Sequence, residues 1–177
     1  MKRDATYRIL RGLIPGYDAV AALTERALVA LTIGRKPREQ LDELSDNFAL
    51  KQARGDRRFE RLAKALEIYW KLGRDLRLDV TLDCWWAKPF EMAVYKILRR
   101  TVRGETLSYG EIAHRIGAPH HARAVGRALG RNQIMIAIPC HRVVEAGGGL
   151  GGFSAGLDLK RRLLAVERVE EELAAPI

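Results

Sequence analysis

Residues 108–130 read SYGEIAHRIGAPHHARAVGRALG, and this stretch decides the fold of the second half of the chain. The spacing predicts a first helix over Tyr109–Ile116, with Ser108 as its N-cap and Gly117 at its end. A second helix is expected over about His121–Gly130. Two short helices joined by about four turn residues have the outline of a helix-turn-helix.

The second of these helices has one apolar side and one basic side. At about 100° per residue, Val125 and Leu129 fall on one side, which we expect to pack. The opposite side carries Arg123, Arg127 and Arg131. Small residues make up the rest of the expected outer surface, at Ala122, Ala124, Gly126 and Ala128. They would let a large partner approach the backbone closely; the alternative interpretation is a solvated arginine face without a partner.

The composition of the 177 residues, with 47% hydrophobic and 30% charged, is that of a globular protein. Its longest wholly apolar run, Ile134–Cys140, is far shorter than the roughly 20 residues that a membrane-spanning helix needs. The opening residues MKRD are followed by no apolar signal core, so we expect a soluble, cytoplasmic protein. Asn and Gln are scarce beside abundant charge, which is compatible with a heat-adapted source.

Positive charge is concentrated in one part of the chain. The whole sequence carries 31 Lys and Arg against 22 Asp and Glu, a net charge of +9. Residues 1–83 hold 17 basic and 13 acidic side chains, whereas Lys88–Arg142 holds 10 basic and 3 acidic ones together with all 4 histidines. This distribution favours a polyanionic partner for the second half of the chain.

The first half of the chain predicts a sheet with helices. Tyr17–Leu23 and Ala27–Ile33 are runs that favour β-structure and could form a hairpin. Residues 35–61 are highly charged, and we expect helix or loop there. Phe59–Leu72 has the apolar spacing of an amphipathic helix, and the strict alternation over Leu76–Asp83 predicts a half-buried strand.

We therefore expect an α/β (α+β) protein of two domains. Residues 1–84 form a small sheet-plus-helix domain of unclear role, and residues 85–177 form a mainly helical domain with the helix-turn-helix. The second domain begins with a helix from Pro89, a residue suited to a first helical turn. It ends with a helix over about Leu157–Ala174, where Glu167 falls on the apolar side and therefore needs a polar partner.

The two cysteines, Cys84 and Cys140, lie in different contexts, which excludes a disulfide framework and a CxxC-type metal site. A free cysteine has a pKa of about 8.5, so useful nucleophilicity needs a nearby base or cation. His141 is adjacent, but neighbours on an extended segment point to opposite faces, so contact with the thiol requires a turn at Pro139 or a bridging water. Glu167 is then the group expected to orient the imidazole. The alternative interpretation is a small buried cysteine beside a satisfied core histidine.

Several motifs in the second half recur together in one known family. They are IPCHRVV at 138–144, GGFSAGL at 151–157 and LLAVE at 163–167, with Asn132 and Lys160, and upstream SYGEIA at 108–113 and RAVG at 123–126. In content and order they strongly resemble the active-site half of the O6-alkylguanine-DNA alkyltransferases. The resemblance covers about residues 90–167, and residues 1–83 contribute little to it.

The resemblance implies direct, single-turnover DNA repair by a methylated-DNA–protein-cysteine methyltransferase that needs no cofactor. The damaged guanine would rotate out of the duplex, and Cys140 would take its O6-alkyl group by in-line displacement to form a thioether. His141 would be the water-linked base and Glu167 its partner. Asn132 would be the hinge between the helix-turn-helix and the active-site segment, and Tyr109 would donate towards the departing guanine.

The resemblance also implies residues for DNA binding and for the substrate pocket. Arg123 would fill the gap that the rotated base leaves in the stack, within a surface that binds the minor groove. The other residues of that surface would be Ala124, Gly126, Arg127 and Tyr109. The pocket would be lined by Val143, Val144, Phe153, Ser154 and Ala155. Arg142 would be structural.

The sequence departs from the family pattern at three positions. Phe153 replaces the usual tyrosine, Ala155 stands where glycine is commonest, and Gln133 follows Asn132 where proline is frequent. These departures bear on the alkyl-group range, the pocket size and the rate. Some relatives carry zinc ligands near their start, but residues 1–83 contain neither Cys nor His, so no metal is expected. The expected partner is double-stranded DNA carrying O6-alkylguanine. We expect the protein to be a monomer and not to associate with a membrane.

Two other classes of function fit parts of this pattern. A cysteine hydrolase would use the same thiolate and imidazole on acyl groups, but it would turn over and would not need a basic helix-turn-helix. A non-enzymatic lesion sensor or regulator would bind through the helix-turn-helix and keep its activity when Cys140 is replaced by alanine. The presence of Cys140 argues against the sensor.

Overall fold

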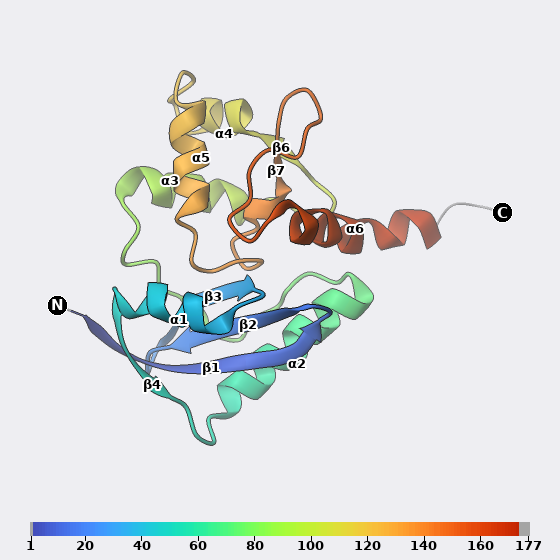
Figure 1. Ribbon diagram of the computed structural model, residues 1–177. Coiled ribbons are helices and arrows are strands. Elements are labelled where there is room, and N and C mark those ends of the chain that lie inside the picture. Colours follow the sequence, from blue (N-terminus) through green and yellow to red (C-terminus); the bar gives the residue numbers. More distant parts are fainter. Residues whose placement is uncertain (1, 174–177) are drawn as a thin grey trace. The chain divides into compact units, whose positions relative to one another are not determined.

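Two compact units make up the structure, a computed structural model that describes residues 2–173 (Figure 1). The first unit consists of Met1–Lys71, Leu76–Trp86 and Gln133–Met135. The second consists of Leu72–Asp75, Ala87–Asn132 and Ile136–Ile177. Each unit therefore takes one short segment from the other half of the chain. The two domains predicted from the sequence, residues 1–84 and 85–177, are each one continuous segment, and this division stays a prediction.

The first unit is built on a five-stranded mixed sheet in the order β4-β1-β2-β3-β5. The strands are β1 (Arg3–Ile14), β2 (Tyr17–Leu23), β3 (Ala27–Gly34), β4 (Phe48–Gln52) and β5 (Thr81–Leu82). The predicted hairpin is confirmed, because β2 and β3 pair antiparallel across a short turn. β1 also pairs antiparallel with β2, whereas β4 and β5 run parallel to their neighbours. The sequence did not reveal β1 or the strand character of β4.

The strand predicted over Leu76–Asp83 is wrong for most of its length. Thr81 and Leu82 alone form β5, which pairs with Ala27 and Leu28 at the start of β3. Residues before 81 would need partners before Ala27, where the chain is turning between β2 and β3. The alternating exposure of this stretch is real, but no neighbouring strand is there to pair with it.

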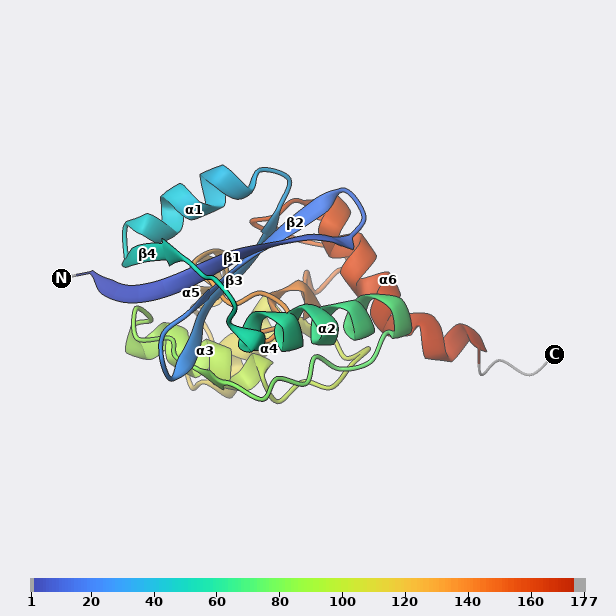
Figure 2. The same cartoon turned by 90° about the horizontal axis from the view of Figure 1, so that it is seen from below.

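Two helices cover the two faces of this sheet. They are α1 (Pro37–Ser45) and α2 (Arg57–Leu72), and α2 confirms the predicted amphipathic helix. Ala5 of β1 belongs to the same apolar cluster as Leu44 of α1. Arg8 of β1 instead lies over the ring of Phe59 in α2, with its guanidinium carbon 6.0 Å from the ring centroid. Odd and even residues of a strand point to opposite faces, so the helices lie on opposite sides of the sheet; α2 runs along one face in Figure 2.

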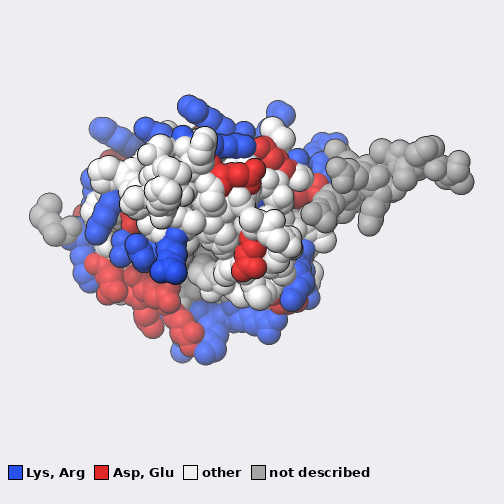
Figure 3. Space-filling model, turned by 90° about the horizontal axis from the view of Figure 1, so that it is seen from above, with Lys and Arg blue, Asp and Glu red and all other residues white. Residues whose placement is uncertain are grey.

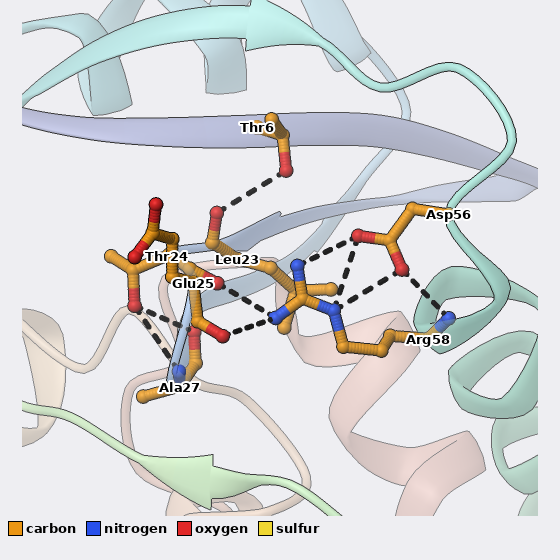
Figure 4. A network of polar contacts seen from close by, with 7 residues as sticks. All are labelled: Thr6, Leu23, Thr24, Glu25, Ala27, Asp56 and Arg58. Atoms are coloured by element: carbon orange, nitrogen blue, oxygen red, sulfur yellow. Dashed lines mark hydrogen bonds and ion pairs between the residues drawn. The ribbon is translucent and has the colours of Figure 1, made fainter.

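Arg58 fastens the turn between β2 and β3 to the start of α2 (Figure 4). Its Nη1 donates to the carbonyls of Thr24 and Glu25, at 2.8 and 2.9 Å. Its Nε and Nη2 donate to the carboxylate of Asp56, the shortest bond being 2.7 Å. These hydrogen bonds lower the pKa of Asp56. Thr24 Oγ1 closes the turn by accepting from the N–H of Ala27, so one guanidinium joins a closed hairpin to a helix.

The second unit is mainly helical, and the α+β fold class is confirmed. Its elements are α3 (Pro89–Leu98), β6 (Leu107–Ser108), α4 (Tyr109–Arg115), α5 (Ala122–Gly130), a 3-10 turn (Cys140–Arg142), β7 (Val143–Val144) and α6 (Leu157–Leu173). The helix-turn-helix of α4 and α5 lies close to the predicted bounds. Ser108 caps α4 as expected: its Oγ accepts from Glu111 N at 3.1 Å, and Glu111 Oε2 accepts from Ser108 N at 2.6 Å.

The packing of α5 corrects one detail of the sequence analysis. Val125 and Leu129 are buried as predicted, but Ala128 is buried too, although it was expected on the outer surface. On the helical wheel Ala128 is only about 60° from Val125, which places it at the border of the apolar side. Its carbonyl accepts a hydrogen bond of 2.9 Å from Tyr95 Oη of α3.

The last helix, α6, was expected to reach Ala174, which lies outside the described residues. Its apolar side packs inward through Leu159 and Leu163. Among the helices of residues 2–173, none combines the length and the hydropathy that crossing a bilayer requires.

Candidate active site

Cys140 begins the 3-10 turn and is buried, with 4% of its surface exposed. The N–H of Arg142 donates to the carbonyl of Pro139 at 3.1 Å, so the chain turns at the proline instead of continuing extended. Asn132 holds this turn from the end of the helix-turn-helix. Its Nδ2 donates to the carbonyl of Ile138 at 2.9 Å and to Cys140 Sγ at 3.1 Å.

Glu167 is shared between His141 and Arg142, and all three side chains are buried. His141 Nε2 and Glu167 Oε1 are 2.7 Å apart. Arg142 donates from Nε to Oε2 at 2.9 Å and from Nη2 to Oε1 at 3.0 Å. Arg142 Nη1 also donates to the carbonyl of Thr101 at 2.7 Å. The inward-facing carboxylate thus has two partners, one of which the sequence did not show.

This network fixes the protonation of the imidazole. Burial by itself would raise the pKa of Glu167, but hydrogen bonds from His141 and Arg142 outweigh it and lower that pKa to about 2. A carboxylate can only accept, so His141 Nε2 carries the proton and Nδ1 is left as the basic nitrogen. Burial lowers the pKa of His141, which keeps its ring neutral at neutral pH.

The thiol is likewise held in its neutral form. Burial raises the pKa of Cys140, and this effect exceeds the opposing hydrogen bond from Asn132. The resting site therefore pairs a protonated thiol with a neutral base in the adjacent residue. Such a pair can generate a thiolate when a substrate arrives, and it keeps the sulfur unreactive until then.

The sequence analysis named Lys160 only as part of the family motifs and gave it no role, but the structure shows one. Its side chain is completely buried, and Nζ donates to the carbonyls of Val143 at 2.6 Å, Gly152 at 3.2 Å and Leu150. These bonds tie the C-terminal end of the glycine-rich loop over residues 145–152 to β7. A lysine between the apolar positions of α6 was the available signal, because a buried ammonium must find acceptors.

A pocket of about 300 Å³ opens beside the thiol. Its lining residues are Tyr109, Gly126, Leu129, Gly130, Cys140, Gly152, Phe153 and Ser154. Three of the residues predicted to line a pocket, Val143, Val144 and Ala155, are absent from this lining. Val143, the first residue of β7, is instead fully buried in the packed interior. Leu129 and Gly130 were missed, although they share one face of α5 with Gly126.

Tyr109 is held in this pocket by two glycines. A Cβ on Gly126 would lie 3.7 Å from the ring, and a Cβ on Gly151 would lie 2.6 Å from the phenolic oxygen. Gly151 also has a φ of +65°, which favours glycine. Burial raises the pKa of Tyr109, against a hydrogen bond from the backbone of Gly152, so the hydroxyl keeps its proton. The phenol can therefore donate to a ligand in the pocket.

The outer side of α5 is basic, but one of its three arginines, Arg131, is neutralised by an ion pair. Arg123 and Arg127 are exposed, and Ala124 is half-buried between them. Arg131 is exposed but forms an ion pair with buried Glu91, at 2.7 Å between Nη1 and Oε1. Figure 3, viewed from the side on which α4 and α5 are drawn in Figure 1, shows a largely uncharged surface with many Lys and Arg along its edge and with some Asp and Glu groups on it. The described residues hold no cluster of three or more His, Cys, Asp or Glu side chains that could bind a metal.

Sequence comparison matches residues 89–169 to the family described as "6-O-methylguanine DNA methyltransferase, DNA binding domain". The chain is 50% identical over 96 residues to the methylated-DNA–protein-cysteine methyltransferase of Mycolicibacterium paratuberculosis, covering 54% of this chain and 58% of that relative. It is 43% identical over 109 residues to the protein of the same name from Methanosarcina acetivorans, covering 62% and 69%. It is also 36% identical over 155 residues to the bifunctional transcriptional activator/DNA repair enzyme Ada of Escherichia coli, covering 86% and 43%.

Solved structures extend the likeness to both units. The Mycobacterium tuberculosis OGT in complex with DNA has a TM-score of 0.78 and 34% identity, with 93% of each chain covered. An O6-methylguanine DNA methyltransferase from Methanococcus jannaschii has a TM-score of 0.62 and 30% identity, covering 92% of this chain and 93% of that one. The matched part of the chain thus includes the sheet of the first unit, which the motifs did not cover.

Proposed function

Because the chain belongs to the methylated-DNA–protein-cysteine methyltransferase family, we propose that it repairs DNA by moving the O6-alkyl group of guanine to Cys140. The observation that carries this proposal is the pocket that places Cys140 and Tyr109 together beside a helix with exposed arginines. A thiol supplies the nucleophile, a phenol supplies a donor for the leaving base, and a basic helix binds the polyanion that presents it.

The reaction is one displacement at the alkyl carbon. Cys140 Sγ forms the new bond to this carbon, the bond to O6 breaks, and its electron pair stays on guanine. The thiol proton passes to His141 Nδ1 through a water, and the carboxylate of Glu167 stabilises the imidazolium that forms. Tyr109 Oη donates to the negative charge growing on the departing guanine, which finally takes up the proton. No cofactor takes part.

The same chemistry makes the reaction single-turnover. The product is a thioether, whose carbon is far less electrophilic than an acyl carbon, so water does not release it. Cys140 cannot regain its thiol by this route, and each chain therefore acts once.

The buried thiol requires the damaged base to leave the duplex. A guanine within the stack cannot reach a sulfur that is 4% exposed, so the nucleotide must rotate into the pocket. Gly126 and Gly130 lack side chains on the pocket side of α5, which allows a close approach by the minor groove. Exposed Arg123 then fills the vacated position and recovers part of the lost stacking.

The deciding experiment mixes the protein with excess duplex oligonucleotide carrying one O6-methylguanine. We expect every chain to gain one methyl group, located on Cys140 by peptide mass spectrometry, and the oligonucleotide to regain guanine in equal amount. A cysteine hydrolase would turn over without keeping the group. A lesion sensor would bind and release the duplex unchanged, and either result would reject the proposal.

We predict that Gly151→Ala slows transfer more strongly than the loss of the Tyr109 hydroxyl alone in Tyr109→Phe. The added methyl group would displace the phenol, since it would lie 2.6 Å from Oη. The matched control is Gly148→Ala, because Gly148 also has a positive φ, +84°, but has open space around it. Single-turnover rates on methylated duplex check this. Equal rates for the two alanine variants would contradict the assigned position of Tyr109.

We predict that Arg123→Ala slows transfer roughly tenfold on duplex DNA and little on a single strand, because only the duplex has to be unstacked. Arg123→Lys keeps the charge but loses the planar group, so it should restore the salt-dependent affinity and not the duplex rate. Transfer rates on matched duplex and single-stranded oligonucleotides measure this. Equal losses on both substrates would remove the stacking role.

A further inference from the structure

The segment between Asn132 and Cys140 leaves the second unit and returns to it. Its residues Gln133–Met135 belong to the first unit, where they lie along the edge of β3. Leu31 N donates to the carbonyl of Gln133 at 2.7 Å, and Met135 N donates to the carbonyl of Leu31 at 2.7 Å. One residue of β3 therefore fixes the chain between the helix-turn-helix and the thiol by two backbone hydrogen bonds.

The far side of the same segment is fixed by Asn132. Its side-chain amide donates to the carbonyl of Ile138 and to Cys140 Sγ. The segment is thus held once by β3 and once by the end of the helix-turn-helix. Ile134 and Ile138 are both fully buried, which leaves little freedom for the residues between them.

Ile136 lies between these two fixed points and has a φ of +68°. Among the described residues it is the one non-glycine residue with positive φ. A β-branched side chain strongly disfavours this left-handed conformation, which persists only where the surroundings impose it. Its side chain is also buried, so the conformation is not an accident of an exposed loop.

We propose that Ile136 is a positioning residue, held left-handed by the pairing of Gln133–Met135 with β3, and that this turn aims Cys140 Sγ into the pocket. The first unit then has a defined task, because Leu31 belongs to it. If the pairing is lost, Ile136 relaxes to negative φ and the chain from Ile138 onwards is redirected. The predicted effect of this turn on alkyl transfer rests on the proposed function. Its predicted effect on the reactivity of the Cys140 thiol does not.

Three variants separate the backbone bond from the side chain. Met135→Pro removes both the methionine side chain and the N–H that donates to Leu31. Met135→Ala removes the side chain but keeps that N–H. Gln133→Pro adds a proline where the pairing uses only a carbonyl. We expect Met135→Pro to transfer about tenfold or more slowly than Met135→Ala, since small displacements of reacting atoms have effects of this size. Gln133→Pro keeps both backbone hydrogen bonds to Leu31, so its rate should change far less than that of Met135→Pro.

A second readout uses no alkylated DNA. Iodoacetamide modifies accessible thiols, and peptide mass spectrometry distinguishes Cys140 from Cys84. Positioning predicts that Met135→Pro changes both the rate and the pH midpoint of Cys140 modification, while the affinity for unmodified duplex stays unchanged. Unchanged thiol chemistry in this variant would overturn the inference. Failure of the wild-type protein to transfer an alkyl group would instead reject the proposed function alone.

The left-handed turn itself is tested at Ile136. Alanine still carries a backbone penalty at this φ and glycine carries none, so Ile136→Gly should melt at a higher temperature than Ile136→Ala. At a position with negative φ, the alanine variant melts at the higher temperature. A higher melting temperature for Ile136→Ala than for Ile136→Gly would therefore overturn the inference.

Hydrogen exchange of the wild-type protein covers the case in which Met135→Pro does not fold. At low denaturant, the amides of Leu31 and Met135 should exchange through the same opening that exposes Cys140 to iodoacetamide. A thiol that becomes reactive while both amides stay protected would contradict the coupling.

Discussion

Replacing Cys140 by alanine is expected to abolish alkyl transfer completely while leaving DNA binding intact. The variant loses the sulfur that forms the new bond, and Cys140 is the one cysteine among the residues that line the pocket. Little else changes, because the amide of Asn132 keeps its bond to the carbonyl of Ile138. The second cysteine gives a matched control, and Cys84→Ala should transfer at the wild-type rate.

Two measurements check this prediction. Mass spectrometry after incubation with methylated duplex should show no adduct on Cys140→Ala and one adduct on Cys84→Ala. A gel-shift titration should show that both variants bind the duplex as the wild-type protein does. Residual stoichiometric transfer by Cys140→Ala would mean that another group is the acceptor, and a full loss of DNA binding would mean that the variant reports on folding instead.

The strands of the first unit show which parts of the fold the sequence could predict. The hairpin of β2 and β3 could be predicted because both runs are largely apolar and pair with each other across a short turn. β1 carries charged residues on the face under α2, where Arg8 covers Phe59, so its pattern did not resemble a buried strand. β4 lies at the sheet edge with much of its length exposed and has almost no apolar pattern.

The candidate site divides in the same way. Cys140, His141 and Glu167 could be identified because one motif and one helical wheel point to them. The three carbonyls that bind Lys160 come from β7 and the glycine-rich loop, and no local pattern encodes that meeting. Nor could the sequence show that Leu31 pairs with residues about a hundred positions away, since backbone hydrogen bonds leave no side-chain signature.

The second large effect is expected at Glu167. Glu167→Ala leaves the buried guanidinium of Arg142 with only the exposed carboxylate of Asp75, 3.5 Å away. Breaking a buried ion pair from one side costs about 3–5 kcal/mol of stability. Glu167→Gln keeps the shape but removes the charge, so it should lose somewhat less. Alanine removes the acceptor that fixes the tautomer of His141, and glutamine keeps one acceptor oxygen but no negative charge to stabilise the imidazolium, so any folded form of either variant should transfer slowly. Urea denaturation at neutral pH measures the stability change.

The pH dependence gives this prediction a sign. The pKa of Glu167 is about 2 in the folded protein against an ordinary value of 4.5. Its stabilisation is therefore complete above about pH 4.5 and is lost as the pH falls towards 2, a change of roughly 3 kcal/mol. The lowered pKa of His141 adds a loss that begins below its ordinary value of 6.5, because the unfolded state then binds more protons.

Glu167→Gln should remove the part of this acid loss that lies below about pH 4.5, so its stability curve should run flatter there than that of the wild-type protein. Glu91→Gln is the matched control, because Glu91 is also a buried carboxylate paired with an arginine, but its partner Arg131 has a side chain 57% exposed and can return to water. We expect this control to cost less stability and to keep the wild-type transfer rate. If both variants gave the same acid curve and the same rate, the charge on Glu167 would not be what sustains the buried network, and the assignment of His141 as an oriented base would lose its support.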